Sequence, residues 1–144
     1  MRIEGSCHCG NLSFGLDWEP EPTEIVARRC SCSFCTRHGG VWTSNPQAQL
    51  RVRVADPAAV SRYTFGTGTA VFHVCSRCGV VPVVSSEVSG HTYAVVNVGA
   101  FTNVSPARIR EAPMSFDGET LGERLARRTR NWIADVEFAD TAAP

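Results

Sequence analysis

Seven cysteines are the residues of this 144-residue chain best suited to chemistry, and they are clustered. They form a pair, a triplet and a second pair, and no cysteine lies outside these groups. Cysteines that served only as small apolar side chains would have no reason to cluster. Metal ligands must bring several sulfur atoms to one point, so the spacing predicts metal binding. The groups are Cys7 with Cys9, Cys30 with Cys32 and Cys35, and Cys75 with Cys78.

The two pairs share a glycine directly after their second cysteine, Gly10 in one pair and Gly79 in the other. In a zinc knuckle the backbone turns sharply around the metal, and glycine relieves the steric cost of that turn. Matching the two pairs therefore gives one site of four thiolates. Four thiolates fill the tetrahedral coordination of zinc, so we expect a structural site. Its predicted ligands are Cys7, Cys9, Cys75 and Cys78.

The triplet Cys30, Cys32 and Cys35 supplies three thiolates from one short segment, which leaves one coordination position of a second zinc open. An open position is typical of catalytic zinc, which holds a substrate thiol as thiolate or polarises a carbonyl oxygen. We therefore predict that these three cysteines form the catalytic site. Two histidines, His38 and His73, are candidate fourth ligands that would make this site structural too. The triplet could instead hold no metal and act as a redox pair of Cys32 and Cys35, or hold a different thiophilic metal such as iron.

Four side chains that follow the first two cysteines of the triplet have candidate secondary roles. Arg37 could offset the negative charge of the thiolates, and His38 could move a proton near neutral pH. Phe34 and Trp42 could form the wall of a pocket. The alternative for each is an ordinary role, on the surface for Arg37 and His38 and in the core for the aromatic residues.

Composition restricts the partners of the chain. The 14 basic and 14 acidic residues give no net charge, so we expect neither nucleic acid nor a membrane surface as a partner. All 14 basic residues are arginines, which excludes Schiff-base chemistry on a lysine. The first residues lack the apolar run of a signal peptide, and the longest apolar stretches are far shorter than the roughly 20 residues of a membrane span. We therefore expect a cytoplasmic protein, and in that reducing compartment clustered cysteines favour metal over disulfides.

The elements that must position these cysteines are mostly short strands. Alternating apolar residues and turn signals at regular spacing predict a mainly antiparallel β architecture in a single domain, residues 1–144. Asp56 and Pro57 predict a short helical turn. Thr120 and Glu123 have the form of a capping box, which predicts a C-terminal helix over 121–135 after a loop that contains 105–113. Strands are expected within 11–18, 25–27, 50–55, 70–74, 80–84 and 92–98.

Three segments of the chain resemble a known family. They are 5–10, then 30–35 with Gly39 shortly after, and then 75–79. Together they are similar to the glutathione-dependent formaldehyde-activating enzyme family, to which the centromere protein V-like proteins also belong. Residues 98–101 resemble the family's valine-glycine-x-leucine element. The resemblance covers about residues 5–101 and includes all seven cysteines in order and spacing.

This resemblance implies a Mss4-like fold, with several small curled antiparallel sheets pinned by zinc, to which a short C-terminal helix is added here. It implies two zinc ions per chain, a structural zinc at the four-cysteine site and a catalytic zinc at the triplet. The implied activity is that of a carbon–sulfur lyase. It joins glutathione or a related thiol to formaldehyde or another small aldehyde, or reverses that reaction, with S-hydroxymethylglutathione as the adduct. The alternative is a non-enzymatic zinc-stabilised binding module or a thiol carrier, because one fold supports many functions.

Overall fold

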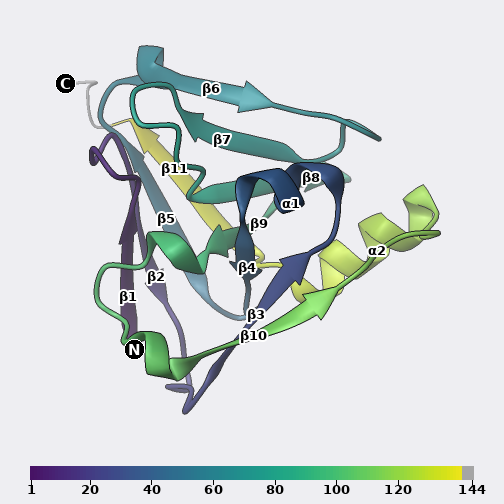
Figure 1. Cartoon of the computed structure of the whole chain (residues 1–144), viewed down its shortest axis with the longest axis horizontal. Helices are drawn as coiled ribbons and strands as arrows, with labels where there is room; N and C mark the ends of the chain where they lie inside the picture. The colour runs from purple at the N-terminus through teal and green to yellow at the C-terminus, as the bar shows by residue number, and fades with distance from the viewer. Residues whose placement is uncertain (141–144) are drawn as a thin grey trace.

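The computed structural model describes residues 1–140, which form two β-sheets and two α-helices (Figure 1). One sheet has four strands in the order β1-β2-β5-β11, and the other has seven in the order β10-β3-β4-β9-β8-β7-β6. The prediction of a mainly β fold with a helix near the C-terminus is confirmed. The predicted domain also included residues 141–144, which lie outside the described residues.

The four-stranded sheet is built on the alternation of apolar residues that the sequence shows. Leu12, Phe14 and Leu16 are buried in β2, and Leu50 and Val52 are buried in β5, so both strands bury one face of the sheet. β1 pairs antiparallel with β2 and β2 with β5, whereas β11 pairs parallel with β5. Its strands are β1 (Arg2–Ser6), β2 (Leu12–Asp17), β5 (Gln49–Val54) and β11 (Asp135–Asp140).

The seven-stranded sheet is antiparallel except for one pair, β10 with β3. The strand expected at 80–84 begins at Val83, because Val80 accepts a hydrogen bond from Cys75 within a tight turn and Pro82 has no N–H. Its strands are β3 (Ile25–Cys30), β4 (Val41–Thr43), β6 (Val60–Tyr63), β7 (Val71–Cys75), β8 (Val83–Val88), β9 (His91–Asn97) and β10 (Ile109–Met114).

Both sheets contribute to the same buried cluster. Ile3 and Leu16 from the four-stranded sheet pack in it with Val83 and Val96 from the seven-stranded sheet. Ile133 lies in this cluster, fully buried, and forms an isolated bridge with a strand of the second sheet. Burying one such aliphatic side chain stabilises the fold by roughly 1.5–3 kcal/mol. The sheets are therefore held together by apolar packing as well as by backbone hydrogen bonds.

Strand β10 occupies part of the segment expected to be a loop, and that expectation is wrong for residues 109–113. The strand lies at the edge of its sheet, hydrogen-bonded to β3 in a parallel register. Most of its side chains are exposed or half-buried, so it lacks the alternating pattern that marks a strand in sequence. Pro113 fits there because the N–H that proline lacks is not needed on the outer side of an edge strand.

Helix α2 (Leu121–Asn131) begins at the predicted capping box. The Glu123 backbone N–H donates to Thr120 Oγ1 at 3.1 Å, and the Thr120 N–H donates to Glu123 Oε1 at 3.2 Å. The helix ends four residues before the predicted boundary at 135. Ile133 leaves the helix because its N–H donates to the backbone oxygen of Ala94 at 2.9 Å, and Val136 then belongs to β11.

Shorter helical segments complete the described chain. Helix α1 (Ser33–His38) follows β3 and was not anticipated. The predicted turn at Asp56 and Pro57 is confirmed as a 3₁₀ turn, Pro57–Ala59, and two more lie at Val98–Ala100 and Pro106–Arg108. Among residues 1–140, no helix is long and apolar enough to span a bilayer. The cytoplasmic location stays a prediction.

Candidate active site

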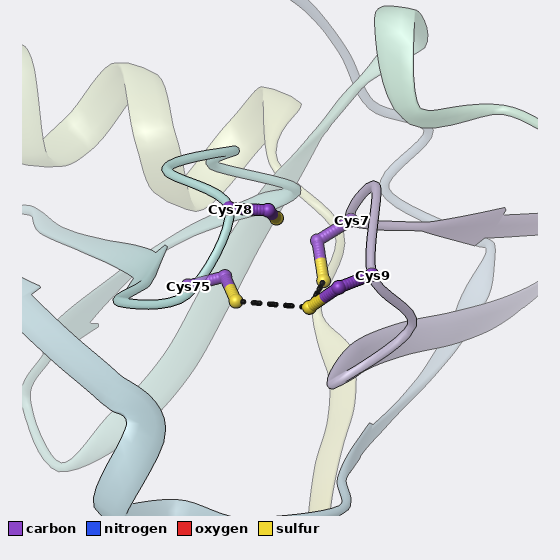
Figure 2. Close-up of side chains that lie close together, drawn as sticks. All are labelled: Cys7, Cys9, Cys75 and Cys78. Carbon is purple, nitrogen blue, oxygen red and sulfur yellow. Dashed lines mark hydrogen bonds between the residues drawn. The ribbon is translucent and has the colours of Figure 1, made fainter.

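The structure brings together the four cysteines of the two pairs, which are far apart in sequence. Cys7 and Cys9 lie in the turn between β1 and β2, Cys75 is the last residue of β7, and Cys78 lies in the turn that follows β7 (Figure 2). All four Sγ atoms are within 4.8 Å of one another. The Sγ atoms of Cys7 and Cys9 are 3.8 Å apart, and those of Cys9 and Cys75 are 3.5 Å apart. This is the grouping that the sequence predicts.

The donor set and its spacing fit a tetrahedral zinc ion. Zinc–thiolate bonds of about 2.3 Å place neighbouring sulfurs about 3.8 Å apart, close to the observed separations. The turns form as the glycines suggest, since Gly10 and Gly79 have φ angles of 87° and 80°. The Leu12 N–H donates to Cys7 Sγ at 3.3 Å, as expected where a backbone wraps around a metal site.

The thiols of this cluster do not ionise alike. Burial raises the pKa of Cys7 to about 11. Burial also opposes ionisation of Cys78, but hydrogen bonds from the backbone N–H groups of Val80 and Cys9 bring its pKa down to about 6. Without a bound cation, some thiols of the cluster thus stay protonated near neutral pH. A divalent cation would displace them, which couples metal binding to proton release.

The triplet is assembled locally at the junction of β3 and α1. Cys30 is the last residue of β3, Cys32 caps the N-terminus of α1, and Cys35 lies within its first turn. The three Sγ atoms lie within 4.8 Å of one another. The Cys35 N–H donates to Cys32 Sγ at 3.3 Å, so the helix cap also orients a potential ligand. Gly39 ends α1 in the left-handed conformation with φ 77°.

Hydrogen bonds to sulfur distinguish the members of the triplet. The Cys35 thiol donates to Cys30, which lowers the pKa of Cys30 to about 5 and raises the pKa of Cys35. The positive charge of Arg127 lowers the Cys30 pKa further. The indole Nε1–H of Trp42 donates to Cys35 Sγ at 3.4 Å in a buried environment. The triplet therefore carries a thiolate near neutral pH even before it binds a cation.

Neither candidate histidine joins the triplet. Within residues 1–140, no histidine, aspartate or glutamate completes the group of three sulfurs. His38 is exposed and stacks on the Phe34 ring with 5.4 Å between centroids. His73 is buried in β7, where its Nε2 lies 2.7 Å from Ser85 Oγ, and burial lowers its pKa to about 4. Its imidazole is therefore neutral at physiological pH and has a partner other than a metal.

A cavity of about 160 Å³ opens beside the triplet, with all three of its cysteines in the wall. Trp42 lines the cavity as expected, whereas Phe34 does not and packs against the Phe72 ring instead, with 4.6 Å between centroids. The wall is strongly aromatic, so the three sulfur atoms share the cavity with large apolar side chains. The aromatic residues that line it are Trp42, Phe65, Phe72, Phe116 and Trp132.

Positive charge at the cavity comes from arginines that the sequence analysis did not single out. The expected candidate, Arg37, is exposed, does not line this cavity and donates to the Ser33 backbone oxygen at 3.0 Å. The missed signal is the arginine spacing of α2, because residues three and four apart share a helix face. The lining arginines are Arg28 from β3 and Arg124, Arg127 and Arg128 from α2.

Glu119 holds two of these arginines in place. Its carboxylate accepts from Arg127 Nε at 2.9 Å and from Arg124 Nε at 3.2 Å, which keeps the pKa of Glu119 below its usual range. The Arg127 guanidinium also lies 3.6 Å from the centroid of the Phe116 ring. Such contacts fix both the direction of the side chain and the position of its charge.

A mainly β fold with a four-sulfur cluster, and a three-sulfur cluster beside an aromatic cavity, defines a class of cysteine-rich fold whose sulfur clusters could each hold a metal ion. The sequence matches the family described as "Glutathione-dependent formaldehyde-activating enzyme" over residues 2–116, and the chain belongs to this family. The resemblance noted in the sequence is thereby confirmed. Helix α2 and strand β11 lie beyond the matched residues.

Two relatives illustrate the extent of the similarity. A Halomonas elongata protein named "Putative glutathione-dependent formaldehyde-activating enzyme" is 33% identical over 85 residues, which cover 54% of this chain and 52% of that protein. The chain thus spans about half the length of this curated relative. A crystal structure of a Rhodobacter sphaeroides protein superimposes with a TM-score of 0.55 and 28% identity, over 76% of this chain and 97% of the other.

Proposed function

We propose that this chain is a carbon–sulfur lyase that joins a thiol such as glutathione to a small aldehyde such as formaldehyde, or cleaves the adduct. The observation that carries this proposal is the gathering of the Cys30, Cys32 and Cys35 sulfurs in the wall of one cavity. Three thiolates leave a coordination position for a substrate thiol. Membership of the formaldehyde-activating family supports the choice of thiol and aldehyde.

Zinc is the metal that the donor sets favour, since thiolate ligands and tetrahedral spacing suit it. We propose two zinc ions per chain, one held by Cys7, Cys9, Cys75 and Cys78 and one held by the triplet. With four protein thiolates the first site is complete and structural. When bound by the triplet, zinc supplies a Lewis-acidic position at which a substrate thiol loses its proton. The cysteines of the triplet are the proposed catalytic residues.

The side chains around the cavity perform the remaining tasks. The aromatic wall excludes water, so that the thiolate is desolvated and the aldehyde is not lost to hydration. The thiolate sulfur attacks the carbonyl carbon, a carbon–sulfur bond forms as the π bond of the carbonyl breaks, and the oxygen takes up the proton that the thiol lost to become a hydroxyl. The reverse reaction breaks that bond and releases the aldehyde. The lining arginines offset the negative charge that thiolates accumulate here.

The test is the substitution Cys32→Ser in the zinc-loaded protein. Formation of the thiol–formaldehyde adduct is followed by NMR, and zinc content is measured per chain. We expect turnover to fall to the uncatalysed rate while about one zinc is retained at the four-cysteine site. Turnover that stays at the wild-type level above the uncatalysed rate would sink the assignment. A wild-type protein that holds two zinc ions but never exceeds the uncatalysed rate would favour a thiol carrier.

A further inference from the structure

The arginines of α2 are a feature of this chain that its family membership does not account for. The family match ends at residue 116, and α2 begins at Leu121. Nevertheless Arg124, Arg127 and Arg128 reach the same cavity as the three cysteines. The helix therefore adds a positively charged wall to the site. We ask which feature of this chain's substrate such a wall would bind.

The charges in this wall are not balanced by the protein. Arg124 and Arg127 share the single carboxylate of Glu119. Arg28 and Arg128 form no ion pair with any carboxylate of residues 1–140. Asp117 also lines the cavity, and it is the acidic residue found among the lining side chains. Among the described residues, two guanidinium groups are thus left without a carboxylate partner.

Arg128 is the more unusual of the two, because its side chain is only 6% exposed. Its Nη1 donates to Thr69 Oγ1 at 2.8 Å and to Ser86 Oγ at 3.1 Å. Its Nε is buried and has no hydrogen-bond partner among the described residues. A buried polar atom of a charged group that has no hydrogen-bond partner is costly, and buried polar atoms almost always have one. The site therefore lacks an acceptor, and a ligand can supply it.

A carboxylate is the acceptor that best matches this deficit. Its two oxygens accept two parallel N–H bonds from one edge of a guanidinium, which gives strength and orientation together. Arg28 donates to Ser44 Oγ at 3.0 Å and has no carboxylate partner among the described residues, so it can make a second contact. A thiol that carries a carboxylate could place its sulfur at the triplet and its charge at this wall.

We propose that Arg28 and Arg128 bind a carboxylate of the thiol substrate, so that the site selects thiols that carry one. This inference depends on the proposed function for the identity of the thiol as glutathione or a close analogue. A competing explanation is that the arginines only balance the thiolate charge. Under that explanation, replacing an arginine should change the affinity for neutral and for carboxylate-bearing ligands equally. Comparing ligands of both kinds therefore distinguishes the two explanations.

The experiment is calorimetric titration of the zinc-loaded protein with S-methylglutathione and with its diethyl ester. The methyl group blocks the thiol, so binding reports on the carboxylate site and not on turnover. We expect the wild type to bind S-methylglutathione at least about 10-fold more tightly than the ester. Arg128→Gln should remove most of that difference, because it leaves the carboxylate without its buried partner.

The matched control is Arg130→Gln, which removes an exposed arginine from the same helix without altering the cavity lining. It should bind both ligands as the wild type does. If Arg128→Gln does not fold, as judged by its melting curve, Arg28→Gln carries the test with the same expectation. Equal affinity of the wild type for acid and ester would overturn the inference, as would an Arg128→Gln or Arg28→Gln variant that behaves like Arg130→Gln. Selective binding without any lyase activity would refute the proposed function alone.

Discussion

At the scale of single residues, Trp42 connects the cavity wall to the triplet. Its indole N–H donates to Cys35 Sγ, and its ring lines the cavity. Such a donor fixes the direction of a ligand atom and spreads its negative charge, as outer-shell partners of metal ligands do. Trp132 lines the same cavity and is about as buried, but within residues 1–140 no hydrogen bond joins it to a sulfur atom. Comparing the two tryptophans therefore distinguishes the effect of a hydrogen bond to sulfur from the effect of lining the cavity.

The substitution Trp42→Phe should lower the zinc affinity of the triplet by about 10-fold, because the outer-shell donor to Cys35 is lost. Competition with a chromophoric chelator measures the affinity of each of the two sites. Trp132→Phe is the control and should leave the triplet's affinity near that of the wild type. If both variants bind zinc as tightly as the wild type, the indole hydrogen bond has no part in ligation.

At the scale of elements, α2 is the helix whose ends decide how the arginine wall is placed. Its N-terminus is fixed by the reciprocal capping box of Thr120 and Glu123. Its C-terminus is fixed by Ile133, which bonds to β9 through Ala94. Between these anchors Arg128 bonds to Ser86 on β8. The helix is thus held at both ends and in its middle, which fixes the positions of its arginines at the cavity.

Thr120→Ala should lower the free energy of unfolding by about 1 kcal/mol, because the Glu123 N–H loses its side-chain acceptor. Urea denaturation followed by circular dichroism measures this change. Thr129→Ala is the matched control, since the Thr129 hydroxyl is exposed and donates only to the Leu125 oxygen inside the helix. It should change stability by less than about 0.5 kcal/mol. Equal losses in the two variants would mean that the cap contributes nothing special.

At the scale of the whole molecule, two features join the sheets. One is the shared apolar cluster in which Leu50 is fully buried. The other is the four-cysteine site, which links the β1–β2 turn of one sheet to the end of β7 in the other. Because Cys9 and Cys75 are 66 residues apart, a metal there closes a long loop, whereas the triplet closes only a short one.

Cys75→Ser should lower the zinc content of the purified protein below two ions per chain and should lower the melting temperature far more than Cys32→Ser does. Both variants lose one ligand of one site, so they are matched in chemistry. The difference arises because only the four-cysteine site joins distant segments, and structural zinc contributes its binding energy to folding. Elemental analysis and calorimetry measure the two quantities. A larger loss for Cys32→Ser would contradict this account.

We propose that the described residues unfold as one unit, as the expectation of a single domain requires. Leu50→Ala should then destabilise the protein by about 2–5 kcal/mol and shift one cooperative transition without splitting it. Calorimetry of the zinc-loaded protein tests this. Leu121→Ala, at a position that is 48% exposed, should shift the transition by much less. Two separate transitions would show that the sheets fold independently.

The features that the sequence predicts well are those that depend on the spacing of residues within a short segment. The cysteine grouping, the strands rich in alternating apolar residues and the cap at Thr120 are all found where expected. Strands β1, β4, β6, β10 and β11 were not predicted. For β10 and β11 the reason is that each pairs in parallel with a strand far away in sequence, and such pairing leaves no local mark. The same holds for Arg128, whose contact with Ser86 depends on how α2 meets β8.

Ile133 and Val136 show how a correct pattern can be misread. Their spacing, added to that of Leu121 and Leu125, continues a helical period beyond the end of α2. The bridge of Ile133 to Ala94 ends that period, since the backbone groups that would extend the helix are used by the second sheet. Tertiary contacts therefore override a local signal that is weak over a few residues.

The separation of the two cysteine pairs along the chain has a consequence for synthesis on the ribosome. Cys7 and Cys9 leave the exit tunnel first, the triplet follows, and the second pair emerges only after some forty further residues. During that interval five thiols are present without Cys75 and Cys78, and an early metal ion meets an incomplete set of ligands. If a metal ion bound at that stage, thiolates would have to exchange on it once Cys78 had appeared, and the order of translation would then affect how the two proposed centres are filled.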